Sequence, residues 1–222
     1  MTLKTWLGAV SFGILSLLAA SQKINLQLTA EEQLFAWVRS FGGKIDGITL
    51  MNPGDGPRGL FTTKEFVNES IIMVIPPEVM IHRGFVLNPE INPAFSTFYQ
   101  GLTASTPFPG DDCTLVALYL MFENFYNRHQ TPISPYLVNL PSWTKNSEYF
   151  SFIPRFWNNG LRALFQTMQS GKNAWDERMT NHANAERFVR TILYPYMSDK
   201  YIIPSADYLH EQFVWAGTIV HT

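Results

Sequence analysis

A cluster of glycines lies between two stretches of the chain that have the pattern of β-strands. The run GDGPRGLFTTKEF covers residues 54–66. Glycines so close together allow positive φ angles and let another group approach the main chain, because they carry no Cβ. The run is therefore either a plain turn that joins two strands or a loop whose backbone contacts a ligand.

The residues on both sides of this run favour strands. Ile45, Ile48 and Leu50 are separated by polar residues before it, and the run IIMVI at 71–75 follows it and ends at Pro76-Pro77. Because this second run is apolar on both faces, we expect a central strand that is covered on both sides.

Helices are expected before and after this β region. Thr29 and Glu32 have the spacing of a capping box, and Gly42-Gly43 end the apolar pattern that follows, which predicts a helix over 30–41. A wide apolar stripe predicts a longer helix over 114–129, with Asp111 and Asp112 favouring its N-terminus.

The rest of the chain also reads as helical, apart from a proline-rich connection over 132–154. Further helices are expected around 158–170, 173–194 and 206–221. The predicted fold class is α+β, with a small split β region near 44–82 followed by a helical region to 222.

The numbers and spacing of charged residues, cysteines and histidines argue against nucleic-acid binding, an internal disulfide and a metal site. With 16 basic and 18 acidic residues, the chain has no global charge that would attract nucleic acid, so no nucleic-acid partner is expected. Cys113 is the single cysteine, which excludes an internal disulfide, and it reads as an apolar filler. The five histidines lack metal-ligand spacing, so no metal site is expected; His129 reads as a helix-end cation and His182 as a surface residue.

The first 21 residues resemble a secretory signal peptide. Lys4 precedes an apolar run over 6–20, and small residues follow at 19–21. A membrane anchor is the second interpretation and a buried helix the third. Cleavage would place the protein in the secretory pathway or outside the cell, with no membrane partner once the leader is removed, and would make Asn68-Glu69-Ser70 a glycosylation sequon. The alternative location is the cytoplasm or nucleus.

Four segments of the chain follow one another in a recognisable order. They are GPRGLFTT at 56–63, IIMVIP at 71–76, PYLVNLP at 135–141 and FVWAGTIVHT at 213–222. Together they resemble the SET-domain methyltransferases, in the branch of the Rubisco large-subunit methyltransferase and the actin-histidine methyltransferase. The resemblance implies a partial SET β-fold over 29–110 and the mostly α-helical SET insert over 111–222.

The same resemblance implies an S-adenosylmethionine-dependent methyltransferase that acts on lysine in a protein or peptide substrate. It assigns cofactor binding to Arg58, Gly59 and Leu60, while Pro57 replaces a glycine of many relatives and has no amide N–H. The family's arginine, Asn-His pair and catalytic tyrosine follow the Trp-Ala helix, past Thr222. No catalytic residue is therefore assigned, and the chain alone is expected to be inactive. The alternative is a secreted non-catalytic binding module or pseudo-enzyme derived from a SET protein.

Overall fold

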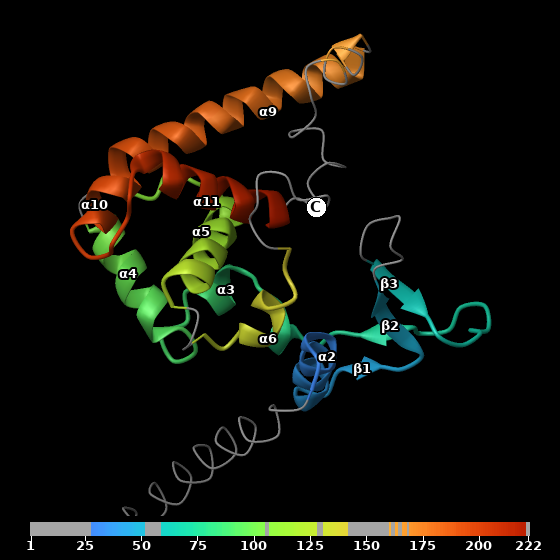
Figure 1. The fold of residues 1–222 in the computed structure, drawn as a ribbon. Coiled ribbons are helices and arrows are strands. Elements are labelled where there is room, and N and C mark those ends of the chain that lie inside the picture. Colours follow the sequence, from blue (N-terminus) through green and yellow to red (C-terminus); the bar gives the residue numbers. More distant parts are fainter. Residues whose placement is uncertain are drawn as a thin grey trace, which may run out of the picture. The chain divides into compact units, whose positions relative to one another are not determined.

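In a computed structural model, the chain forms two compact units (Figure 1). All strands of the described residues follow helix α2 (Ala30–Ser40) in the N-terminal part of the chain, and the remaining helices come after the strands. The first unit contains the residues up to Leu50 together with Leu60–Pro76, and the second is built mainly from Pro77 onward. The two units are described separately. The described residues are 28–51, 59–104, 107–127, 131–141, 160, 163, 166–167 and 169–220.

The first unit begins with helix α2, Ala30–Ser40, which confirms the helix predicted from the capping box. The main-chain N–H of Thr29 donates to Glu32 Oε2 at 2.7 Å, and the N–H of Glu32 donates to Thr29 Oγ1 at 3.2 Å. These two bonds satisfy amides that a helix start otherwise leaves unpaired. After the helix, Gly42 takes a φ of 86° that favours glycine.

Four short strands form two separate two-stranded sheets in this part of the chain. Strand β1 (Lys44–Ile45) pairs antiparallel with β4 (Met73–Val74), and β2 (Ile48–Met51) pairs with β3 (Gly59–Thr62). The glycine run therefore connects two paired strands, although residues 52–58 lie outside the described part.

Helix α2 also contacts the edge of β2 through one carboxylate. Glu31 Oε1 accepts hydrogen bonds from the main-chain N–H of Leu50 and from Thr49 Oγ1, both at 2.7 Å. A side chain thus takes the place that a neighbouring strand would have along this part of β2.

The expectation of a buried central strand over 71–75 is wrong. Strand β4 covers two residues, and no strand of the described part pairs with its second edge. Ile71 is 79% exposed and Ile72 46% exposed. An apolar run shows that a segment is hydrophobic, but it does not show how many elements pack on that segment. Here the sheet has only two strands, so the run stays exposed.

The second unit is helical, and its longest helices lie near the C-terminal end of the described chain. The sequence did not predict helix α4, which begins with Pro93 directly after Asn92. The elements are η1 (Pro77–Val79), α3 (Arg83–Val86), α4 (Pro93–Thr103), α5 (Asp112–Phe125), α6 (Ser134–Leu137), α9 (Gln169–Phe188), η3 (Val189–Leu193), α10 (Tyr194–Ser198) and α11 (Ala206–Val220).

Helix α5 forms the centre of this unit. Asp111 caps it, as the sequence predicted, by accepting the N–H of Thr114 at 2.8 Å. Helix α11 packs along α5, and α3 and α4 contact α5 as well (Figure 1). Aromatic rings fill the space between α4 and α5, where Phe98 lies 4.7 Å from Phe122 between ring centroids. The division between the two units falls at Pro76, whereas the resemblance places the boundary of the SET segment at residue 110.

The helix predicted over 173–194 continues past its expected end. A π-helical turn, η3, joins α9 to α10, and the N–H of Tyr194 donates to Val189 O. This bond spans five residues instead of four. The turn lets the helical path run through Pro195, which has no N–H to donate.

Candidate functional site

The glycine loop places two of its three predicted cofactor-binding residues at the start of strand β3. Gly59 and Leu60 are the first residues of this strand, and Arg58 lies outside the described part. Leu60 is 52% exposed. The side chain of Leu60 is thus accessible, whereas Gly59 is half-buried in a strand that pairs with β2.

The main chain following β3 is held by contacts within the first unit. The N–H of Thr63 donates to Gly47 O at 2.8 Å, and Gly47 has a φ of 68°. Lys64 forms an ion pair with Asp46, and the hydrogen bond from this lysine lowers the pKa of Asp46. Both groups are exposed, so the pair contributes little to stability. These contacts fix where β3 ends.

Seven apolar side chains between residues 60 and 74 are exposed, which is unusual for a packed β region. We call them the apolar sheet surface. They are carried by β3, by β4 and by the connection between these strands. They are Leu60, Phe61, Val67, Ile71, Ile72, Met73 and Val74.

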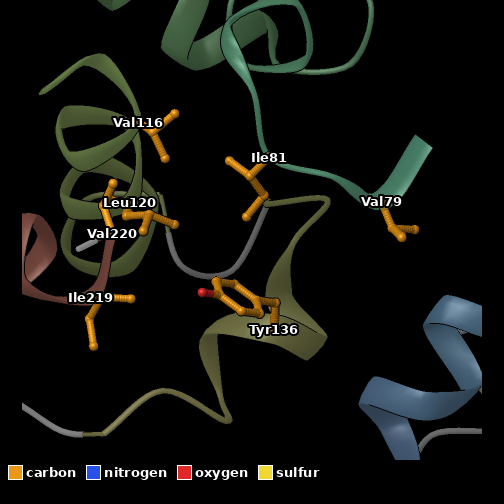
Figure 2. A pocket seen from close by; sticks show the side chains of 7 residues that line it. All are labelled: Val79, Ile81, Val116, Leu120, Tyr136, Ile219 and Val220. Atoms are coloured by element: carbon orange, nitrogen blue, oxygen red, sulfur yellow. The ribbon is translucent and has the colours of Figure 1, made fainter. Parts of the chain in front are cut away.

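The second unit has a pocket of about 310 Å³ that is lined mostly by apolar side chains. Figure 2 shows side chains from α5, α6, α11 and the segment around η1 facing this space. The only polar atom among the lining side chains is the hydroxyl of Tyr136. The pocket suits an apolar group, and its lining supplies no acid, base or cation. The lining residues are Val79, Ile81, Val116, Leu120, Tyr136, Ile219 and Val220.

A buried carboxyl group lies beside a buried tyrosine on α5. Glu123 and Tyr119 are both 0% exposed. Glu123 Oε2 accepts a hydrogen bond from Asn127 Nδ2 at 2.9 Å, and Glu123 Oε1 is buried with no hydrogen-bond partner among the described residues. The Tyr119 hydroxyl donates to Asn92 Oδ1 at 2.8 Å.

Burial raises the pKa of Glu123, and hydrogen bonds from Thr131 and Asn127 offset only part of this rise. Burial also raises the pKa of Tyr119, and the negative charge of Glu123 adds to this effect. No solvent reaches either group, so the pair lies inside the packed core of the second unit. In the sequence, Glu123 is a single acidic residue within the apolar stripe of the predicted helix. The burial of this residue was not predicted from the sequence.

Two histidines, far apart in sequence, meet between α9 and α11. The rings of His182 and His210 are 4.9 Å apart between centroids and are tilted by 37°. His182 was predicted to be a surface residue, but it is half-buried and lies beside His210. His82 instead caps α3, where its Nδ1 accepts the N–H of Gly84 at 3.1 Å, and His129 lies outside the described residues.

An ion-pair network lies beside these histidines. Arg190 bonds to Glu186 at 2.9 Å and also pairs with Asp207 of α11. The hydrogen bond from Arg190 lowers the pKa of Glu186, and the two histidines lower it further. Within the described ranges, no three side chains of histidine, cysteine or acidic type are placed to hold a metal ion. The arrangement fits a seam between two helices.

One long-range hydrogen bond joins two of the segments on which the family resemblance depends. Trp215 Nε1 donates to Pro141 O at 2.9 Å across 74 residues of sequence. The indole is 1% exposed and packs edge-on against Phe125, with 5.5 Å between ring centroids. Nearby, Asn139 Nδ2 donates to Pro135 O at 2.9 Å and thereby braces the turn that presents Pro141.

The chain matches no family model, no curated protein and no solved structure. Among the helices of the described ranges, none combines the length and apolar character needed to cross a bilayer. The predicted leader lies within residues 1–27, outside those ranges.

Proposed function

We propose that this chain carries the N-terminal SET segment and helical insert of an S-adenosylmethionine-dependent protein methyltransferase that acts on lysine. The hydrogen bond from Trp215 to Pro141 carries the proposal. It links the FVWAGTIVHT segment to the PYLVNLP segment, so two motifs that resemble the family in sequence also meet in space. A chance resemblance of separate short motifs gives no reason for them to meet.

The β region gives a second line of support. The glycine loop connects the paired strands β2 and β3, as a loop beside a cofactor pocket in a partial SET fold would do. The exposed apolar residues of β3 and β4 include neighbours that point to opposite faces of their strands, as is expected of sheets that lack covering elements. Completion by further strands would also remove the open edge of β4.

The cofactor would supply an electrophilic methyl group on a sulfonium. In the proposed site, Arg58, Gly59 and Leu60 bind and orient it, with the main chain of Gly59 able to approach closely because it has no Cβ. Methyl transfer also requires alignment with the acceptor and exclusion of water. Leu60 is 52% exposed, so water is excluded only when another segment or chain covers the apolar sheet surface. We therefore expect the chain alone to bind the cofactor weakly and to transfer no methyl group.

Titration with S-adenosylmethionine tests this proposal. Millimolar cofactor should raise the melting temperature of the chain, because a ligand that binds only the folded state stabilises it. Gly59→Ala should reduce this rise by adding a methyl group where the cofactor approaches the backbone. Gly217→Ala is the matched control, since a Cβ at Gly217 meets no atom within 4 Å. No rise in the parent chain, or equal rises in the parent and Gly59→Ala, would contradict the proposal.

A secreted non-catalytic binding module is the second candidate. The pocket of the second unit favours it, since the side chains that line it are apolar apart from the hydroxyl of Tyr136. Under this alternative the same titration gives no cofactor response. The first candidate is compatible with the cytoplasm or nucleus, whereas the second requires the secretory pathway.

A further inference from the structure

The connection between β3 and β4 contains an exposed turn with a modification motif. The turn is closed by a hydrogen bond from the N–H of Ser70 to Val67 O at 3.1 Å. Glu69 takes a φ of 65°, and Asn68, Glu69 and Ser70 are all exposed. Asn68-Glu69-Ser70 is the only Asn-x-Ser/Thr tripeptide of the sequence. The acceptor amide and the hydroxyl two residues later thus lie together on an accessible turn.

The residues flanking this turn have no packing role that would exclude a bulky group. Val67 is 82% exposed and Ile71 is 79% exposed, on either side of the tripeptide. Exposed aliphatic side chains of this size favour association with other surfaces. A hydrophilic group attached at Asn68 would lie beside both and reduce that tendency.

We propose that Asn68 is N-glycosylated and that the glycan shields the exposed apolar residues beside it. Asn68 Nδ2 forms a bond to the anomeric carbon of an oligosaccharide carried on a lipid pyrophosphate. The bond from that carbon to the pyrophosphate oxygen breaks, the lipid pyrophosphate leaves, and the amide gives up one proton to a base of the transferase. The inference requires entry into the secretory pathway, and it is independent of methyl transfer.

The test is expression of the full chain in a eukaryotic cell with its own leader. The product should lose apparent mass on treatment with an endoglycosidase, and peptide mass spectrometry should place a single glycan on Asn68. Asn68→Gln and Ser70→Ala should each abolish the modification. Ser70→Thr keeps the motif and should retain it.

A further control separates backbone geometry from the motif. Glu69→Gly places glycine at the positive φ and preserves Asn68 and Ser70, so it should remain glycosylated. In a second experiment, the chain is expressed behind the signal sequence of a well-secreted protein. This experiment distinguishes a leader that does not direct secretion from an Asn68 that does not accept a glycan. An unmodified product from the chain's own leader overturns the proposal. If the second product is modified, the leader is at fault, and if it also lacks glycan, Asn68 is not an acceptor. Neither result bears on cofactor binding.

Discussion

Replacement of Glu123 by glutamine should change how the stability of the second unit depends on pH. The carboxyl group is 0% exposed, and burial raises its pKa above the ordinary value of 4.5. The folded state therefore holds this proton over a pH range in which the unfolded chain has released it. Stability from this group is fully present below pH 4.5 and is lost as pH rises through the folded pKa.

The size of the effect follows from the linkage relation. Each unit by which the folded pKa exceeds the unfolded one removes about 1.4 kcal/mol from the free energy of unfolding at high pH. Between the two pKa values, one group gives a slope of at most about 1.4 kcal/mol per pH unit. Glutamine has nearly the same shape, can still accept the bond from Asn127, and does not titrate.

Urea unfolding from about pH 4 to about pH 8 measures this difference. The free energy of unfolding of the parent relative to Glu123→Gln should fall as pH rises. Glu186→Gln is the matched control: Arg190 lowers the pKa of Glu186, so its stabilisation is lost as pH falls, which is the opposite sign. Parallel pH profiles for the parent and Glu123→Gln would refute the raised pKa of the buried Glu123 carboxyl.

Three further substitutions test packing in the second unit by thermal or urea unfolding. Gly101→Ala should destabilise by about 1–2 kcal/mol, because the added Cβ would overlap the hydroxyl of Tyr196, whereas Gly217→Ala meets no atom and should stabilise by about 0.5–1 kcal/mol. Equal effects of these two substitutions would contradict the packing around Gly101. Trp215→Phe should cost about 1–2 kcal/mol by leaving Pro141 O without its donor, and an unchanged stability would show that this bond does not contribute.

Local side-chain chemistry in the sequence predicted several helix boundaries. The capping box of Thr29 and Glu32 marked the start of α2, and Asp111 marked the start of α5. Each signal depends on residues three positions apart, so it does not require the rest of the fold. The mixed helix and strand content was also predicted from local patterns, namely the spacing of apolar residues and the positions of glycines and prolines.

Features that depend on distant partners were not predicted. Apolar composition at 71–75 indicated a buried strand, but burial depends on how many elements pack on the strand. His182 pairs with His210 because α9 contacts α11. Glu123 of α5 is bonded by Asn127, which follows this helix, and is buried by the surrounding elements. A single sequence gives no measure of these contacts. For the candidate cofactor loop, the sequence indicated a connection between strands, and its ligand remains a proposal.

The contact between Glu31 and strand β2 has a consequence for self-association. The carboxylate bonds to the N–H of Leu50, so this amide is not available to a strand from another molecule. The negative charge of the Glu31 carboxylate also repels the main-chain carbonyl oxygens of a strand that approaches this edge. The second edge of β4 has no such guard among the described residues, and its side chains are apolar. Any intermolecular sheet growth from the first unit should therefore be less favourable at β2 than at β4, which makes β4 one place to add a lysine or proline if the protein aggregates.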